Sequence, residues 1–172
     1  KNNFATIVNL LTLQSNSLKN PEAIAALNDA IGRVNSMHVL YEKLLLTDDY
    51  ETTSIKTYLD NLIDDLLEFF SKDIDIQVER EIDDFQIDSK LLFPIGLIIN
   101  ELFTNIMKYA FPNRISGFIE VLLKENNGEV ILTVKDDGIG YPEGFDFDES
   151  NGFGMMLIKV LIKQLDGNIK VD

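Results

Sequence analysis

The sequence contains no cysteine and no tryptophan, and its only histidine is His38. Without cysteine the chain has no disulfide and no thiolate metal site, which agrees with a reducing compartment. Basic residues are also scarce, because 15 lysines and arginines face 29 aspartates and glutamates and the net charge is −14. A surface this acidic repels phosphate backbones, so we expect no nucleic-acid partner.

Long apolar runs are missing too. No run approaches the ~20 apolar residues of a membrane span, and the most apolar piece, Leu91–Ile99, contains Pro94. We therefore expect this part of the chain to be cytoplasmic and to make no membrane contact. The sequence begins at Lys1 without a methionine, so we expect a fragment of a longer protein, in which a membrane anchor could lie upstream.

Four common kinds of site are absent as patterns. No P-loop sequence occurs, and no Ser-His-Asp or metallohydrolase spacing is present. The acidic loop Asp136–Asp148 is not an EF-hand, because its third position is Gly138 rather than an oxygen ligand. A nucleotide or metal site must therefore be sought in another pattern.

One apolar helix is predicted over Ile95–Phe111, and it carries the polar residues Asn100, Glu101, Asn105 and Lys108. At ~100° per residue, Glu101, Asn105 and Lys108 fall within roughly 60° of one another on the helix. A carboxylate and an amide oxygen suit Mg²⁺ and a lysine suits phosphate, so this face is equipped for a charged ligand. The same pattern also fits an amphipathic core helix with a solvated polar stripe.

Two glycine-rich stretches lie downstream of this helix. Val134–Gly140 reads VKDDGIG and follows an apolar strand, and Asn151–Leu157 reads NGFGMML and opens a helix. Glycine lets a backbone approach a ligand closely, and the free N–H groups of a helix N-terminus attract phosphate. Each stretch taken alone also fits an ordinary turn or helix start.

In this order, the segments ELFTNIMKY, DDGIG and GFGMML resemble the N, G1 and G2 boxes of the GHKL ATPases, the Bergerat-fold group. Within that group the chain is most similar to the two-component sensor histidine kinases. Three boxes in the right order are a specific signal, whereas any one of them alone would be weak. The resemblance implies ATP and Mg²⁺ as ligands.

The resemblance also assigns roles to matching residues. It implies that Asp136 accepts a hydrogen bond from the adenine amino group, which fits a buried carboxylate because a carboxylate only accepts. Asn105 would bind Mg²⁺, and Glu101 would orient, or take a proton from, the attacking group. Asp137 occupies a variable position and receives no role, and Ile106 replaces the small residue usual at its position. The other residues expected to bind the nucleotide are Lys108, Tyr109, Gly138, Gly140, Gly152 and Gly154.

The N-terminal part predicts an antiparallel hairpin of two helices, Asn2–Leu18 and a second one that begins at Pro21 after the cap Asn20. The second helix has apolar residues at alternating steps of three and four, as in a coiled-coil seam. A lone hairpin exposes this seam, so we expect it to pair with a second copy as a four-helix bundle, or else to pack on its own C-terminal domain. The seam consists of Ile24, Leu27, Ile31, Val34, His38, Tyr41 and Leu45.

This region has a resemblance of its own. KNNF and the later PEAIAALNDAIGRVNSMHVLYEKLL are similar to the dimerisation and phosphoacceptor hairpin of one histidine-kinase branch, whose motif reads His-Arg-Val-Lys-Asn-Asn. The resemblance puts the acceptor histidine just before Lys1, outside this sequence. We expect His38, which lies on the seam, to be a packing residue, because an acceptor must meet the γ-phosphate and a partner protein in water.

The middle of the chain begins the second domain. Thr47–Thr53 is predicted as a polar connection and domain boundary, and Ser54 as the cap of a helix over Ile55–Phe70. Ile74–Ile82 has the period-two pattern of a half-buried strand, and a short strand over Phe85–Ile87 is expected to pair with it.

Asp88 or Ser89 is then expected to cap the polar-faced helix. Further along, two strands, Gly117–Lys124 and Glu129–Lys135, flank the hairpin signal Asn127-Gly128. The later segments are a mobile loop matching the family's ATP lid, a helix and the start of a last strand. These three are predicted over Asp136–Asn151, Phe153–Leu165 and Gly167–Asp172, respectively.

We therefore predict an α+β fold. A helical hairpin over residues 1–49 is the dimerisation and phosphotransfer region without the acceptor histidine. An α/β two-layer sandwich of the Bergerat type follows over residues 50–172 as the ATP-binding catalytic domain, with its last strands missing.

The resemblance implies the core of a sensor histidine kinase that acts as a homodimer. Such a kinase transfers the γ-phosphoryl of ATP to a histidine and then to an aspartate of a response-regulator receiver domain. This part of the chain should bind ATP but not autophosphorylate. Two alternatives stay open: a degenerate kinase or histidine phosphotransferase that only docks a regulator, and another GHKL protein such as an anti-sigma serine kinase or a gyrase-type ATPase.

Overall fold

The computed structural model describes residues 2–46, 52–70, 74–147, 149–150 and 152–171. Backbone contacts divide the chain into two compact units, residues 1–49 and 50–172. The first is helical and the second mixes helices with sheet, which confirms the predicted α+β fold class. Most of the predicted connection at Thr47–Thr53 lies outside the described residues.

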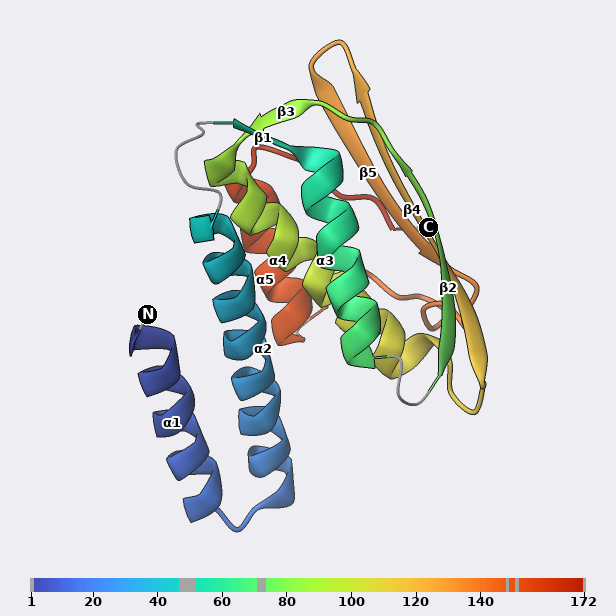
Figure 1. Ribbon diagram of the computed structural model, residues 1–172. Coiled ribbons are helices and arrows are strands. Elements are labelled where there is room, and N and C mark those ends of the chain that lie inside the picture. The colour runs from blue at the N-terminus through green and yellow to red at the C-terminus, as the bar shows by residue number, and fades with distance from the viewer. Residues whose placement is uncertain (1, 47–51, 71–73, 148, 151, 172) are drawn as a thin grey trace. The chain divides into compact units, whose positions relative to one another are not determined.

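The first unit is the predicted hairpin. Its helices α1 (Asn2–Ser17) and α2 (Pro21–Leu46) run antiparallel, as Figure 1 shows. The side-chain oxygen of Asn20 accepts hydrogen bonds from the backbone N–H groups of Glu22 and Ala23 at 2.9 and 3.3 Å. A cap residue followed by proline therefore starts α2.

The hairpin buries few of its side chains. Among those that the structure describes in this unit, only Ser15 is fully buried, and its hydroxyl donates to the Asn28 side-chain oxygen at 3.2 Å. Ile7, Leu10 and Leu13 of α1 are 44%, 62% and 67% exposed. The first helix thus presents apolar surface to solvent, which suits contact with another protein surface.

The second unit contains a two-layer α/β arrangement. The strands β2, β4 and β5 form one sheet in that order, with β2 parallel to β4 and β4 antiparallel to β5. The helices α3, α4 and α5 lie on one side of this sheet (Figure 1). The elements are β1 (Thr52–Ser54), α3 (Ile55–Phe70), β2 (Asp75–Ile82), β3 (Gln86–Asp88), α4 (Ser89–Asn105), the π-helical turn η1 (Ile106–Ala110), β4 (Ser116–Asn126), β5 (Glu129–Asp136) and α5 (Phe153–Gln164).

The core lies between these helices and the sheet. Every second residue of β4 faces inward, and Ile119, Val121 and Leu123 are at most 3% exposed. On α4, Ile99 and Phe103 are buried without any exposed surface. A central helix and a central strand therefore supply much of the buried apolar area that stabilises the unit.

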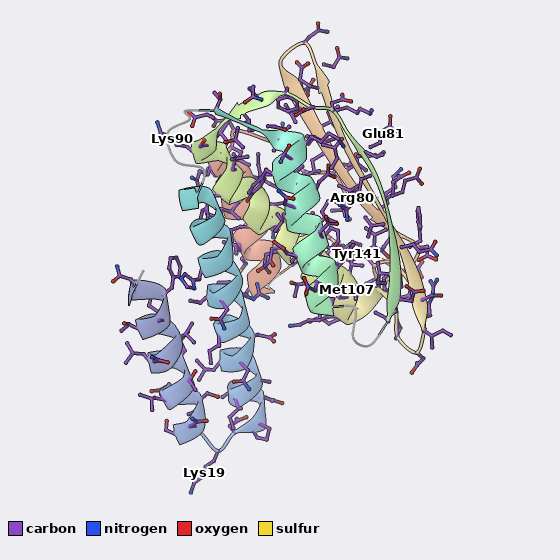
Figure 2. The ribbon with its side chains drawn as sticks, viewed as in Figure 1. Lys19, Arg80, Glu81, Lys90, Met107 and Tyr141 are labelled. Atoms are coloured by element: carbon purple, nitrogen blue, oxygen red, sulfur yellow. The ribbon has the colours of Figure 1, made fainter. Side chains whose placement is uncertain are left out.

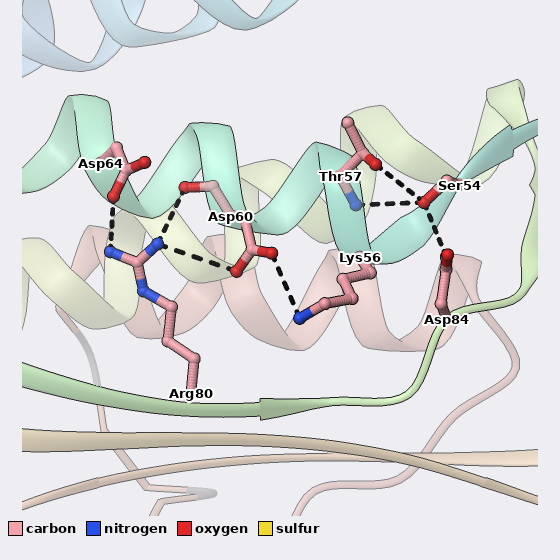
Figure 3. A network of polar contacts seen from close by, with 7 residues as sticks. All are labelled: Ser54, Lys56, Thr57, Asp60, Asp64, Arg80 and Asp84. Atoms are coloured by element: carbon pink, nitrogen blue, oxygen red, sulfur yellow. Dashed lines mark hydrogen bonds and ion pairs between the residues drawn. The ribbon is translucent and has the colours of Figure 1, made fainter.

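Polar side chains join β2 to α3 at the side of the core (Figure 3). Arg80, on the helix-facing side of β2, donates to the Asp64 carboxylate at 2.6 Å and to the backbone oxygen of Asp60 at 3.2 Å. The hydroxyl of Ser54 accepts a hydrogen bond from the N–H of Thr57 at 3.1 Å, so Ser54 caps α3 as predicted.

The turn between β4 and β5 is also as predicted. Asn127 and Gly128 have φ angles of 54° and 85°. Positive φ at both central residues is what a tight hairpin turn requires, and asparagine followed by glycine adopts it most readily. The turn sets the pairing of Asn126 with Glu129 and hence the register of the two strands.

Two strand predictions were wrong. The short strand β3 pairs antiparallel with β1, Thr53 opposite Ile87, and not with β2. Strand β1 could not be predicted, because Thr52–Ser54 is short and polar, but its backbone groups offer β3 a partner. The predicted strand over Gly167–Asp172 is also absent in the part that the structure describes, residues 167–171, which pairs with no neighbouring strand.

One helical stretch, Ser89–Ala110, is long and apolar enough to cross a membrane by length and composition. More than half of it, 56% of its most apolar window, is buried inside the protein. The central helix of a soluble core has the same composition, so this stretch is weak evidence for a membrane span.

Candidate functional site

The predicted polar-faced helix is α4, which begins where expected. The Asp88 carboxylate accepts a hydrogen bond from the N–H of Lys90 at 2.8 Å and caps the helix. Pro94 lies in the second turn and is buried. The helix therefore runs through the core, and its C-terminal residues lie at one end of the sheet.

The polar residues of α4 are more buried than predicted. Glu101 is 1% exposed and Asn100 is 4% exposed, so the alternative of a solvated polar stripe is wrong for this part of the helix. An ionised carboxylate held away from water is costly unless polar or charged groups surround it. A buried carboxylate beside a ligand site is a common arrangement for acid–base or orienting roles.

The helix changes its winding directly after Asn105. Residues Ile106–Ala110 form a π-helical turn, in which each hydrogen bond spans five residues instead of four. The prediction of a continuous α-helix with about 100° per residue was wrong here, so Lys108 does not keep the angular position expected from α-helical spacing. Lys108 and Tyr109 are exposed, whereas Ile106 and Ala110 are buried.

Asp136 is the last residue of β5, at the same end of the unit. Its Oδ1 atom accepts a hydrogen bond from the N–H of Gly138 at 2.9 Å, which folds the chain into a local turn. The carboxylate is exposed, so the expectation that it is buried was wrong for this structure. Its acceptor atoms are therefore accessible to a ligand that approaches the turn.

The segment after β5 lies directly on the end of η1. The N–H of Ile139 donates to the backbone oxygen of Ala110 at 2.9 Å. A Cβ atom added to Gly138 would lie 2.5 Å from both the Cβ and the oxygen of Ala110. The DDGIG segment and the ELFTNIMKY helix, which lie about 30 residues apart in sequence, therefore meet in space, and the glycine is needed for their close approach.

The loop that follows is held by an aromatic pair. The rings of Tyr141 and Phe145 stack with centroids 4.1 Å apart, across a turn closed by a 3.0 Å hydrogen bond from Phe145 N–H to the backbone oxygen of Pro142. Gly140 and Gly144 have φ angles of 69° and 78°, which favour glycine. Burial and, to a smaller extent, the nearby Asp136 charge raise the pKa of Tyr141. Figure 2 labels Tyr141 and Met107 of η1 in this part of the unit.

The second glycine stretch starts α5. Gly152 is its N-cap residue and makes no side-chain cap hydrogen bond to the helix. Gly154 is buried, and α5 packs beside α4. The ammonium of Lys159, on α5, donates to the backbone oxygen of Ser150 at 3.2 Å and lies over the Phe147 ring.

A metal ion would have few protein ligands here. Within the ranges that the structure describes, no three histidine, aspartate or glutamate side chains are grouped so that they could hold one. Mg²⁺ commonly takes one or two protein oxygens and completes its shell with phosphates and water. The half-buried amide of Asn105, next to the buried Glu101, fits this pattern because it offers a hard oxygen donor.

Two residues of this region were missed by sequence reasoning. Asp137 received no role, yet its carboxylate accepts hydrogen bonds from Arg114 at 2.6 Å and from the N–H of Phe118 at 2.7 Å. Arg114 also donates to the backbone oxygen of Asp137 at 2.6 Å. An aspartate directly after a strand could have suggested a cap, but nothing in the sequence indicated Arg114 as its partner.

His38 lies in the hairpin unit, on α2. Its ring stacks on that of Phe4, with centroids 5.2 Å apart and planes 28° from parallel. This contact agrees with the packing role expected for His38.

Two family models match the chain. Residues 1–70 match a model described as histidine kinase, and residues 93–172 match one described as histidine kinase-, DNA gyrase B-, and HSP90-like ATPase. The second match contains most of α4, η1 and both glycine stretches. The three segments that resemble the N, G1 and G2 boxes therefore lie inside the ATPase match.

Similar proteins are found along nearly the whole chain. The sensor histidine kinase PdtaS of Mycobacterium tuberculosis is 28% identical over 171 residues, which are 98% of this chain but 34% of PdtaS. Blue-light-activated histidine kinase 2 of Erythrobacter litoralis is 25% identical over 177 residues, 99% of this chain and 50% of that kinase. The chain thus spans at most half the length of these two relatives.

The fold has solved counterparts as well. The histidine kinase domain of a blue-light-activated histidine kinase from Erythrobacter litoralis superposes with a TM-score of 0.68. The two chains are 23% identical, and the match covers 94% of this chain and 86% of the other. At this identity the match concerns the fold alone. The two family models and the relatives together support a two-component histidine kinase.

Proposed function

We propose that the chain is the kinase core of a sensor histidine kinase, which binds ATP with Mg²⁺ and transfers its γ-phosphoryl group to a histidine. Residues 50–172 would bind the nucleotide, and residues 1–49 would form the dimerisation and phosphotransfer hairpin. The observation that supports this best is the contact of the Gly138–Ile139 segment with Ala110. It brings two of the three family boxes to one place on the molecule.

The residues of the site divide into a base side and a phosphate side. The exposed carboxylate of Asp136 would accept a hydrogen bond from the adenine amino group, and Gly138 and Gly140 would let the backbone approach the base. Lys108 would contact phosphate, with Tyr109 beside it. Asn105 would supply an oxygen to Mg²⁺, which when bound neutralises phosphate charge.

The catalytic role falls to Glu101. Its near-complete burial beside Asn105 suits a group that orients the attacking imidazole or takes its proton. Gly152 and Gly154 would allow the phosphates to approach the first turn of α5, where N–H groups and the helix dipole favour negative charge. Transfer of a phosphoryl group depends mainly on such positioning and charge stabilisation.

The hairpin suggests the other half of the reaction. Its helices bury no apolar side chain fully among those described, and α1 exposes Leu10 and Leu13, so pairing with a second copy would cover apolar surface. The product would be a phosphohistidine, whose phosphoryl group an aspartate of a receiver domain would then accept, leaving the histidine free. We further propose that residues 1–172 bind ATP without phosphorylating themselves, since their only histidine packs on Phe4. The setting would be the cytoplasm.

Titration calorimetry with ATP and Mg²⁺ tests the proposal. We expect saturable binding by the wild-type chain and at least about tenfold weaker binding by Asp136→Asn, because a charged acceptor is replaced by a neutral amide in which one acceptor oxygen has become a donor. Asp64→Asn is the matched control, since it neutralises an exposed carboxylate of α3 that pairs with Arg80 of β2. A wild-type chain with no affinity for ATP would favour the alternative of a degenerate, docking module.

Labelling with γ-³²P-ATP addresses the transfer step. We expect no label on residues 1–172 and acid-labile label once the preceding residues with an acceptor histidine are present. Label on His38 would overturn the assignment of the hairpin. Label on a serine of a partner, or turnover stimulated by DNA, would instead indicate another GHKL protein.

A further inference from the structure

Arg114 and Asp137 join the two segments that form the candidate site. Arg114 lies between η1 and β4, and Asp137 follows the last residue of β5. One guanidinium nitrogen donates to the Asp137 carboxylate and the other to its backbone oxygen, both at 2.6 Å. This two-point contact fixes the orientation of both residues, as a planar guanidinium does well.

The Asp137 carboxylate also extends the sheet. The N–H of Asp137 donates to the backbone oxygen of Phe118 at 3.1 Å, and the N–H of Phe118 donates back to Asp137 Oδ1 at 2.7 Å. The side chain thus replaces a backbone acceptor one step beyond the last strand pair, Ile119 with Asp136. It ties the residue after Asp136 to Phe118 of β4.

Arg114 is itself held in place. Its guanidinium lies over the Phe111 ring, 5.2 Å from the centroid. The backbone N–H of Arg114 donates to the backbone oxygen of Phe111 at 3.2 Å. Phe111 is 6% exposed and its ring packs against Gly117, where an added Cβ would lie 2.6 Å away. The arginine is therefore anchored to the residue that directly follows η1.

We propose that Arg114 and Asp137 are a positioning pair for the nucleotide, which fixes Asp136 relative to the end of η1. This inference rests on the proposed function. Residues 137, 138 and 139 all contact the segment from 110 to 118. Among the hydrogen bonds of the described residues, the side chain of Asp136 bonds to Gly138 and not to Arg114 or Asp137. The pair acts through Asp136, whose exposed carboxylate lies at the end of β5, directly before Asp137.

The pair is well placed to affect binding more than folding. The side chains of Arg114 and Asp137 are 38% and 44% exposed. Exposed ion pairs stabilise a fold little, because water screens them and their side chains lose entropy. A shift of a binding group by a fraction of its hydrogen-bond length, in contrast, weakens the contact that it makes.

The test compares Arg114→Ala, Asp137→Asn and the double variant with wild type by titration calorimetry, using ATP and ADP with Mg²⁺. We expect about fivefold weaker binding in each single variant, no further loss in the double variant, and partial recovery in Arg114→Lys. The losses should be equal for ATP and ADP, since the pair acts on the base side. Arg80→Ala is the matched control, because Arg80 also makes a 2.6 Å ion pair and a backbone contact, but with α3.

The outcomes separate this inference from the proposed function. Unchanged affinity in Arg114→Ala, an equal loss in Arg80→Ala, or a loss seen with ATP but not with ADP would each overturn the positioning role. A lower melting temperature with unchanged nucleotide affinity would mean that the pair is merely structural, and this too would overturn the positioning role. A wild-type chain that binds no ATP would overturn the proposed function itself.

Discussion

Gly138 occupies a point where two segments of the second unit nearly touch. An added Cβ would lie 2.5 Å from the backbone oxygen of Ala110, and backbone cannot move aside as a flexible side chain can. At Gly152, in contrast, an added Cβ would meet no atom within 4 Å among the described residues beyond its chain neighbours, and the φ of −67° suits any residue. The two glycines therefore serve different purposes although both lie in glycine-rich motifs.

Alanine substitutions separate these purposes. We expect Gly138→Ala to destabilise the protein by about 1–3 kcal/mol, the usual effect of an extra carbon in a packed position. Gly152→Ala should leave the free energy of unfolding within about 0.5 kcal/mol of wild type, as surface substitutions do. Urea denaturation measures both, and equal losses for the two variants would show that the Gly138 contact is not tight.

Asp137 should make stability depend on acid pH. Its hydrogen bond from Arg114, followed by that from Phe118 N–H, lowers the pKa of Asp137 below its usual 3.8. A lowered pKa in the folded state means that the stabilisation is present above pH 3.8 and is lost as the pH falls through the folded value.

Urea denaturation of wild type and Asp137→Asn at several pH values measures this dependence. The wild type should be the more stable protein at pH 6, and the difference should shrink steadily below about pH 4. If the difference in free energy of unfolding between the two proteins stays constant from pH 6 to pH 2.5, the charge of the Asp137 carboxylate does not stabilise the fold.

At the scale of elements, the start of α4 decides whether the central helix is well formed. The Asp88 carboxylate satisfies the N–H of Lys90. Removing such a cap leaves an N–H group without its partner, so Asp88→Ala should cost about 1 kcal/mol of unfolding free energy. Asp88→Ser keeps a capping oxygen and should retain most of it. If the two variants unfold at the same urea concentration, the cap contributes nothing.

The sequence predicted elements whose signals are local. Asn20-Pro21, Ser54 and Asp88 mark helix starts by side chains that bond to their own helix, and Asn127-Gly128 marks a turn through its backbone angles. Such signals act within a few residues, so no knowledge of the rest of the fold is needed. The alternation of buried residues along β4 was readable for the same reason.

Features that depend on distant residues were not predicted. The pairing of β1 with β3 and the bond of Arg114 to Asp137 join segments that the sequence does not relate. The π-helical turn after Asn105 ends at Ala110, which packs against Gly138, so its winding is fitted to a neighbour that comes later in the chain. The site residues were named from their motif, but the burial of Glu101 and the exposure of Asp136 required the structure.

At the scale of the whole molecule, the division into two units predicts independent behaviour. Residues 50–172 contain every residue assigned to nucleotide binding, and residues 1–49 contain none. A chain of residues 50–172 should therefore fold and bind ATP with Mg²⁺ within about twofold of the affinity of residues 1–172, since separate units usually contribute independently. Titration of both chains checks this, and a tenfold loss in the shorter chain would assign part of the site to the hairpin.

The central claim is that one nucleotide binds with the end of α4 and η1 on one side of it and the two glycine stretches on the other. Hydrogen–deuterium exchange of residues 1–172, with and without ATP and Mg²⁺, tests it most directly because it reports on each segment separately. We predict slower exchange in peptides covering 101–109, 136–140 and 152–154, and no change in α1. Unchanged exchange in these three segments at saturating ATP, or protection confined to other parts of the chain, would contradict the account.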